Sequence, residues 1–380
     1  MSIDFSKVPS PCYLLDERLL RKNLELIETV QKRAGINIIL AFKGFAMWSV
    51  FPIIREYVSG ASASSLNEVL LCFEEMKVKA HTYAPAYSPA EFDQIINMSS
   101  HISFNSLSQF HKYWPGIKAR NAKVSCGLRV NPEYSEVEID LYNPCAPGSR
   151  LGVLADELKE KKLPEGIEGF HFHNLCESSS FALEKTLKSF EEKFGDWIPQ
   201  LKWINMGGGH LMTKKGYDID HLVTTLNSFK EKNNIEVILE PGSAFAWESG
   251  FLVTEILDIV ENGGIKTAIV DASFTAHMPD TLEMPYQPNI IGATDPEKGK
   301  PTYRIGGVSC LAGDFISEHS FEKELEIGDQ IIFEDMIHYT MVKTSMFNGV
   351  KHPNIAIWTM NNELQIVKEF NYLDFKNRLS

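Results

Sequence analysis

The stretch Asn37-Ile38-Ile39-Leu40-Ala41-Phe42-Lys43 reads as a short buried strand that ends on a lysine. A continuous apolar run is typical of a strand covered on both faces, as in a parallel sheet. The stem of Lys43 would then lie among apolar groups, and partial burial favours the neutral, nucleophilic amine. A lysine at a strand end can also simply extend its amine to solvent. The rest of the chain decides between these two interpretations.

Strand-like and helix-like segments alternate from this point to Glu240. Apolar runs predict strands at residues 37–42, 57–61, 80–84, 101–104, 124–130, 167–173, 202–206 and 235–240. Helix-like stretches lie between them at 45–56, 66–76, 89–98, 107–114, 154–162, 180–197 and 218–233. Eight strands alternating with helices predict an α/β fold, a (β/α)8 TIM barrel. A doubly wound open sheet would give the same alternation, so the count of eight is the argument for closure.

The pattern changes after Glu240 to short strands separated by turn residues. These candidate strands occupy residues 252–260, 268–270, 303–305, 330–333, 355–358 and 364–367. They predict a mostly β C-terminal domain. A further strand at 10–15 has no place among the eight and is expected to join it. The predicted division is therefore 21–248 for the barrel, and 1–20 with 249–380 for the β domain. Residues 131–149 and 289–301 are expected to be surface loops.

Composition excludes several classes of protein. The 380 residues carry a formal charge of −13, which argues against a nucleic-acid or anionic-membrane surface as partner. No apolar run reaches the roughly 20 residues that a membrane helix needs, and no signal peptide is evident. The six cysteines are scattered without a Cys-x-x-Cys pair, as expected for reduced thiols in a cytoplasmic enzyme.

Residues with useful chemistry stand where the predicted barrel strands end, which is where such barrels place their active sites. They are Lys43, Arg129, Asn131, His171, His173, the triplet Gly207-Gly208-Gly209, and Glu240-Pro241-Gly242. Loops after the seventh and eighth strands often hold a phosphate, and glycines let backbone N–H groups approach it. Glycine triplets also occur in plain turns, but we favour a phosphate site here because a predicted helix follows and Lys43 shares the barrel mouth.

A phosphate site combined with a carbonyl-reactive lysine indicates pyridoxal 5′-phosphate (PLP). Glu240 closes the apolar run Val237-Ile238-Leu239, and a carboxylate there would keep the pyridine nitrogen of PLP protonated. His173 could stack on the ring. His171 and His173 could instead bind a metal, but no third ligand is evident.

Several motifs in this order resemble the alanine-racemase-like, fold-type III family of PLP decarboxylases, which includes diaminopimelate, ornithine and arginine decarboxylases. The motifs are Ala41-Phe-Lys-Gly44, Gly169-Phe-His-Phe-His173, Gly207-Gly-Gly209, Glu240-Pro-Gly242, Ser309-Cys-Leu-Ala-Gly-Asp314, Glu334-Asp-Met-Ile-His-Tyr339 and Phe347-Asn-Gly349. The resemblance covers nearly the whole chain. Within the family, the chain is most similar to the branch that acts on carboxylated polyamines, through Phe42-Lys-Gly44, His173-Asn-Leu-Cys-Glu177 and Gly242-Ser-Ala244.

The resemblance implies a role for each matching residue. Lys43 would bond to the aldehyde carbon of PLP, His173 would stack on its ring and Glu240 would contact its pyridine nitrogen. The phosphate ligands would be Gly208, Gly209 and, from the second domain, Tyr339. Cys310 would reach the site of the other subunit of a homodimer and return a proton to the substrate. Asp314, in the same loop, would help to bind the substrate amine.

Three positions depart from the family pattern. Ser243 stands where several relatives have an arginine on the phosphate, Asn174-Leu175-Cys176 replaces a Val/Ile-Gly-Ser sequence, and Ser62 replaces an aspartate. The phosphate site is therefore expected to differ from that of these relatives.

The charged residues of segment 271–286 indicate which chemical group the far end of the substrate carries. Where diaminopimelate decarboxylases need a cation for the distal carboxylate, segment 271–286 here has no arginine or lysine but contains Asp280 and Glu283. Two carboxylates would repel a second carboxylate and attract an amine, which favours a polyamine tail. Both could also be solvated loop residues.

Three alternatives stay open at this point. They are a diaminopimelate or ornithine decarboxylase, a PLP-binding regulatory protein without turnover, and a metal-dependent barrel hydrolase.

Overall fold

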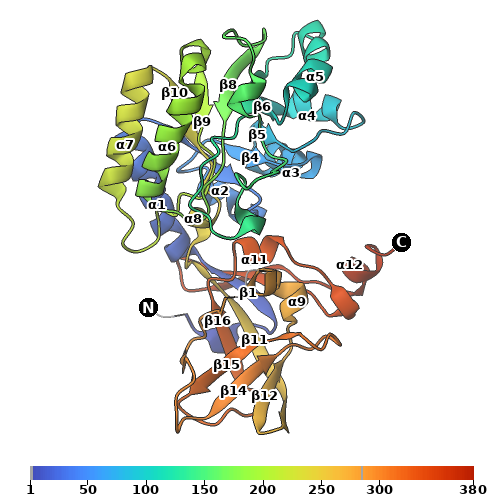
Figure 1. Cartoon of the computed structure of the whole chain (residues 1–380). Coiled ribbons are helices and arrows are strands. Elements are labelled where there is room, and N and C mark those ends of the chain that lie inside the picture. Colours follow the sequence, from blue (N-terminus) through green and yellow to red (C-terminus); the bar gives the residue numbers. More distant parts are fainter. Residues whose placement is uncertain (1–2, 284–285) are drawn as a thin grey trace. The chain divides into compact units, whose positions relative to one another are not determined.

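The computed structural model describes residues 3–283 and 286–380, and these divide into two units (Figure 1). One unit is Asn23–Phe245, and the other combines Met1–Lys22 with Ala246–Ser380. The boundary between them falls inside helix α1 (Glu17–Ala34).

The strand that opens the first unit also closes its sheet into a barrel. Residues 37–41 form β2 (Asn37–Ile38), which pairs with β10 (Glu236–Leu239), and β3 (Leu40–Ala41), which pairs with β4 (Ala61–Ala63). The N–H of Ile39 donates to Leu239 at 2.9 Å, and the next N–H donates to Gly60 at 3.1 Å. One segment thus bonds to both the last and the second strand, all in parallel, so the predicted (β/α)8 barrel is confirmed.

The remaining strands and helices of the barrel unit alternate along the chain. The strands between β4 and β10 are β5 (Ala80–Tyr83), β6 (Ser99–Phe104), β7 (Ser125–Arg129), β8 (Ile167–His171) and β9 (Trp203–Asn205). After α1, the α-helices are α2 (Phe51–Ile54), α3 (Leu66–Leu71), α4 (Phe92–Met98), α5 (Leu107–Ala119), α6 (Ser180–Phe194), α7 (Ile219–Asn233) and α8 (Ser243–Ala246). Figure 1 shows α6 and α7 side by side outside the strands. No helix within 3–283 and 286–380 is long and apolar enough to cross a membrane.

Two sequence-based predictions in this unit were wrong. The second strand is the short β4 rather than residues 57–61, because Ala61-Ser62-Ala63 carries no large apolar side chain that would mark it. The helix predicted at 154–162 is one 3₁₀ turn, Ala155–Glu157, followed by a lysine-rich loop. The predicted loop 131–149 is a loop with many exposed residues, and several of its residues also line a cavity.

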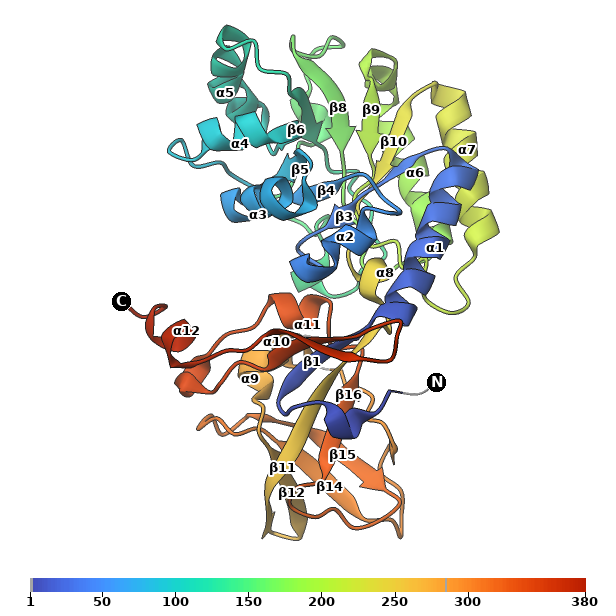
Figure 2. The same ribbon diagram turned by 180° about the vertical axis from the view of Figure 1, so that it is seen from behind.

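The second unit is built on a mixed sheet in which β1 (Cys12–Asp16) is an inner strand. It pairs antiparallel with β11 (Gly250–Asn262) and parallel with β17 (Asn354–Trp358). All five residues of β1 are buried, which explains the apolar sequence at this end of the chain. Figure 2 shows β11 as the long strand that runs through this unit.

The other elements of this unit extend the sheet or lie beside it. The strands are β12 (Ile265–Val270), β13 (Ala293–Thr294), β14 (Thr302–Gly306), β15 (Phe315–Phe321), β16 (Gln330–Glu334) and β18 (Leu364–Lys368). The helices are α9 (Phe274–His277), α10 (Pro279–Glu283), α11 (Tyr339–Val342) and α12 (Tyr372–Lys376). β15 escaped prediction because its polar residues, Ser317, Glu318, His319 and Ser320, interrupt the apolar pattern.

Candidate active site

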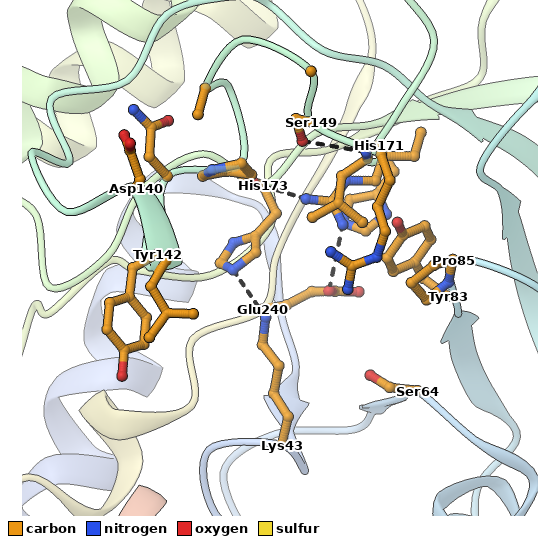
Figure 3. A pocket seen from close by; sticks show the side chains of 18 of the residues that line it. Lys43, Ser64, Tyr83, Pro85, Asp140, Tyr142, Ser149, His171, His173 and Glu240 are labelled. Carbon is orange, nitrogen blue, oxygen red and sulfur yellow. Dashed lines mark hydrogen bonds and ion pairs between the residues drawn. The ribbon is translucent and has the colours of Figure 1, made fainter. Parts of the chain in front are cut away.

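A cavity of about 880 Å³ lies at the carboxyl ends of the barrel strands (Figure 3). Its lining includes Lys43 after β3, Arg129 at the end of β7, His171 at the end of β8, His173 two residues further on, and Glu240 after β10. Its volume is in the range of about 300–1,000 Å³ that small-molecule sites occupy. The fold therefore brings residues from distant parts of the sequence into one site.

Lys43 lies in the turn that follows β3, and its side chain projects into the cavity (Figure 3). The turn is held close to the end of β10, since a Cβ atom on Gly44 would lie 2.7 Å from the Cα atom of Gly242. The amine remains accessible through the cavity although protein surrounds it. Burial lowers the pKa of Lys43 to about 8, with a further contribution from the charge of Arg129. Lys43 is thus a better nucleophile at neutral pH than a surface lysine.

The hydrogen bonds of His173 fix the proton positions around this amine. The N–H of Gly208 donates to Nδ1 of His173 at 2.9 Å, and Nε2 lies 2.8 Å from Nζ of Lys43. Burial, with the charges of Lys43 and Arg129, lowers the pKa of His173, so the ring is neutral. A neutral ring that accepts at Nδ1 carries its proton on Nε2. Nε2–H can therefore donate to Nζ in the neutral-amine form of Lys43, and the lowered pKa of Lys43 increases the population of that form.

Glu240 supplies a carboxylate at the end of an apolar strand. Asn205 Nδ2 donates to its Oε1 at 2.6 Å, and its Oε2 lies 3.8 Å from Nε2 of His171. Burial raises the pKa of Glu240, while the hydrogen bond from Asn205 and the charge of Lys43 act in the opposite direction. A ligand with a protonated nitrogen beside this carboxylate would favour its ionised form.

Arg129, which the sequence placed at the active-site end of a strand without a defined role, and Asn205, which the sequence did not single out, both contribute to the site. Arg129 is 4% exposed. Its Nη2 donates to the carbonyl of His173 at 3.0 Å, and its guanidinium group lies 4.6 Å from the centre of the Tyr83 ring. Asn205 also accepts from the N–H of Gly207 at 2.9 Å. An arginine that ends a buried strand was visible in the sequence, whereas the role of Asn205 depends on the neighbouring strand β10.

The glycine triplet is explained by close packing of the backbone. A Cβ atom on Gly208 would lie 2.4 Å from the carbonyl oxygen of Glu240. Gly209 has a φ of +88°, and its Cβ would lie 2.2 Å from the carbonyl oxygen of Leu175. Both positions therefore require glycine whether or not a phosphate binds. In this structure the Gly208 N–H is occupied by His173, so the phosphate role of Gly208 and Gly209 stays a prediction.

Cys310 and Asp314 belong to one loop of the second unit. Cys310 is exposed, and its N–H donates to Asn348 at 2.9 Å. Asp314 is buried, and its carboxylate accepts from the N–H groups of Thr275 at 3.0 Å and Ser309 at 3.1 Å. Asp314 therefore shapes the loop that presents Cys310, and its contact with the substrate amine stays a prediction.

Asp280 and Glu283 both lie on α10 of the second unit, but their surroundings differ. Oδ2 of Asp280 accepts from Thr340 at 2.9 Å and from Tyr286 at 3.2 Å. Its Oδ1 is buried without a hydrogen-bond partner in the described part of the chain. Glu283 forms an ion pair with Lys343, which neutralises its charge. Asp280 is therefore better suited than Glu283 to accept an ammonium group.

The remaining predicted ligand, Tyr339, begins α11 in the second unit. Its contact with a phosphate, which the resemblance implies, stays a prediction.

The side chains of the cavity fit PLP. Lys43 offers an amine to the aldehyde, and Glu240 offers a carboxylate to the pyridine nitrogen. His173 offers a flat ring, which contacts Lys43 through Nε2 and the N–H of Gly208 through Nδ1. Both ring nitrogens of His171, which is 2% exposed, have no hydrogen-bond partner within 3–283 and 286–380. Such buried polar atoms are expected where a polar ligand completes the site. Among the same residues, no three His, Cys, Asp or Glu side chains gather to hold a metal ion.

The fold and this site define a PLP-dependent decarboxylase. Residues 12–337 match the family model for the pyridoxal-dependent decarboxylase, C-terminal sheet domain, and the chain belongs to this family.

Particular relatives cover nearly the whole chain. The carboxyaminopropylagmatine decarboxylase of Synechocystis is 51% identical over 98% of this chain and 96% of its own length. The carboxynorspermidine/carboxyspermidine decarboxylase of Campylobacter jejuni is 44% identical over 98% of this chain and 99% of its own.

A solved structure agrees with these relatives. The crystal structure of carboxynorspermidine decarboxylase from Campylobacter jejuni, complexed with norspermidine, has a TM-score of 0.91 at 43% identity. It covers 98% of this chain and 100% of that one. Diaminopimelate decarboxylase from Helicobacter pylori, at 20% identity and a TM-score of 0.81, shares the fold.

Proposed function

We propose that this protein uses PLP to decarboxylate carboxynorspermidine or carboxyspermidine, which yields norspermidine or spermidine in polyamine biosynthesis. The observation that carries the proposal is the full-length similarity to the Campylobacter jejuni enzyme, at 44% identity. The geometry of Lys43, His173 and Glu240 supports it, since it supplies the groups that PLP chemistry needs. Diaminopimelate decarboxylases, at about 20% identity, are distant by comparison.

Different residues of the chain are proposed to have different roles in the reaction. When bound, PLP supplies a ring that takes up the electron pair left on the α-carbon as CO2 departs. Lys43 would hold the cofactor through its aldehyde carbon and would give way to the substrate amine. Glu240 would keep a proton on the ring nitrogen, and His173 would provide a flat ring beside it. Cys310 returns one proton to the α-carbon, so each turnover consumes one proton and releases one CO2.

Asp280 is proposed to bind an amine of the substrate tail. Its Oδ2 is held by Thr340 and Tyr286, while its buried Oδ1 lacks a hydrogen-bond partner among the described residues. A buried carboxylate oxygen without a donor is unfavourable unless a ligand supplies one. Glu283, already paired with Lys343, would add less.

A second candidate substrate is carboxyaminopropylagmatine, because the Synechocystis relative is 51% identical. This compound shares the reacting carbon but carries a guanidinium group at the far end of its tail. The two candidates therefore require the same catalytic residues and differ in the contacts to the tail.

A panel of substrates tests these assignments directly. CO2 release would be measured from carboxynorspermidine, carboxyspermidine, carboxyaminopropylagmatine, diaminopimelate, ornithine and arginine. We expect kcat/KM to be highest for one of the first two compounds. The highest value for carboxyaminopropylagmatine would favour the second candidate. Efficient turnover of diaminopimelate or ornithine would overturn both, because a second carboxylate or a short tail does not fit the predicted amine-binding groups.

We further propose that the protein is a cytoplasmic homodimer in which Cys310 of one subunit acts in the site of the other. Cys310 is an exposed thiol on an ordered loop, as such a role requires. A closed dimer with two-fold symmetry would build two identical composite sites.

Mixing two inactive variants tests the shared site. Subunits of Lys43→Ala and Cys310→Ala would be dissociated, mixed in equal amounts and reassociated. Random pairing places one intact site in half of the dimers, so we expect about a quarter of wild-type activity. Each variant reassociated alone is the control. If mixed dimers form but activity does not return, Cys310 acts within its own subunit or not at all.

A further inference from the structure

The 3₁₀ turn Asp140–Tyr142 (η4) borders the cavity, and all three of its residues line it. We propose that Asp140 binds an ammonium group in the tail of the substrate and so helps to select polyamine substrates. This rests on the proposed function and adds a barrel residue to substrate recognition, separate from Asp280 in the other unit.

The charges around the cavity point to Asp140. Among the residues that line it, the carboxylates are Asp140 and Glu240. Glu240 is bound by Asn205 and lies beside Lys43 and Arg129, where the reaction takes place. Asp140 is exposed and lies on the His173 side of Lys43 in Figure 3. Among the described residues that line the cavity, Asp140 is therefore the carboxylate that remains available to pair with a cation in the substrate tail.

Tyr142 on the same turn provides a second feature that suits an ammonium group. It lines the cavity next to Asp140 (Figure 3). An aromatic ring beside a carboxylate attracts an alkylammonium ion through the ring face as well as through charge. Leu141, which is 69% exposed, offers an apolar surface for the methylene groups between the amines.

The loop that carries this turn is anchored at both ends. At the start, Ser135 donates to the carbonyl of Asn174 at 2.7 Å, and Glu136 pairs with Lys185 at 2.6 Å. At the end, Asn105 Nδ2 donates to the carbonyl of Arg150 at 2.8 Å. These contacts fix the two ends of the loop, so the turn borders the cavity while part of it stays exposed to solvent.

The buried ring of His171, already noted in the fit of PLP, also indicates that this cavity takes a polar ligand. The buried side chain of His171 lines the cavity, and neither ring nitrogen has a hydrogen-bond partner in the described part of the chain. A ligand with polar groups is therefore expected in this cavity of about 880 Å³, whose lining includes both His171 and the turn.

The test compares Asp140→Asn with Glu138→Gln in the PLP-loaded enzyme. Glu138 lies two residues away on the same loop, is exposed and does not line the cavity, so its variant controls for the loss of one negative charge. For Asp140→Asn we expect KM for carboxynorspermidine to rise about tenfold, with kcat changed less than about twofold. Glu138→Gln should leave both constants unchanged.

Binding of norspermidine, measured by calorimetry, separates this proposal from the proposed function. Asp140→Asn should weaken norspermidine binding by about the same factor as it raises KM, while the absorbance of bound PLP stays as in the wild type. If the wild type decarboxylated none of the polyamines, the binding measurement would still decide the role of Asp140. Equal norspermidine affinity in the wild type and Asp140→Asn would overturn the proposal, as would an equal loss in Glu138→Gln.

Discussion

Replacement of Lys43 by alanine is expected to remove the visible absorbance of covalently bound PLP and the adduct that borohydride traps. Decarboxylation should fall by about 10³-fold or more, because Lys43 is the one lysine among the described residues that line the cavity. The structural reason is the position of Nζ in the cavity, 2.8 Å from Nε2 of His173. Lys202→Ala, a surface lysine paired with Glu168, is the control and should behave as wild type. A borohydride adduct in the Lys43→Ala protein would assign the bond to another lysine.

The pH dependence of PLP binding tests the neutral state of Lys43. Burial lowers the pKa of Lys43 to about 8, so the reactive neutral fraction rises as pH increases and levels off above that value. From pH 7 to pH 9 the rate of adduct formation by the apoprotein should increase roughly tenfold. A rise of roughly 100-fold would indicate an ordinary lysine whose pKa lies above this range. Reaction of PLP with a free lysine derivative in the same buffers corrects for the titration of PLP itself.

The positions that follow buried parallel strands were the most predictable part of this site. Lys43, His173 and Glu240 each follow an apolar run, and the ends of parallel strands in a barrel meet at one face. The structure places the three in one cavity. The prediction from apolar runs succeeds here because the positions of these side chains are set by the ends of the strands and not by a loop.

The residues that sequence patterns missed depend on contacts that no periodicity encodes. Asn205 is the last residue of β9, and its importance comes from the neighbouring carboxylate of Glu240. Asp140 lies in a loop whose path over the cavity is set by side-chain anchors such as Ser135 and Glu136. Such anchors are tertiary interactions, so the same residues read along the chain as a plain polar loop.

The glycine triplet shows how one sequence feature can have two physical explanations. It was interpreted as a phosphate site because glycine lets N–H groups approach an anion. The structure gives a sufficient reason in packing alone, since Cβ atoms at Gly208 and Gly209 would collide with backbone oxygens of Glu240 and Leu175. A glycine therefore marks a close approach, and the identity of the approaching group needs further evidence.

The second large effect is expected from Glu240→Gln. The variant keeps the size of the side chain and can still contact Asn205, but it loses the negative charge that would hold a proton on the ring nitrogen of PLP. Without that proton the ring withdraws electrons less strongly, and the barrier to CO2 loss rises. We expect PLP to remain bound through Lys43 while kcat falls about 10²-fold or more.

The control for this variant lies on the same strand. Glu236→Gln changes an exposed residue at the other end of β10, which is hydrogen-bonded to Asn37, and should leave kcat unchanged. Both proteins would be assayed with carboxynorspermidine after the absorbance of bound PLP confirms equal loading. Near-normal turnover by Glu240→Gln would show that another group sets the electronic state of the ring. Loss of PLP from Glu240→Gln would instead assign Glu240 to cofactor binding, because a charge that acts on the reaction alone leaves the covalent bond to Lys43 intact.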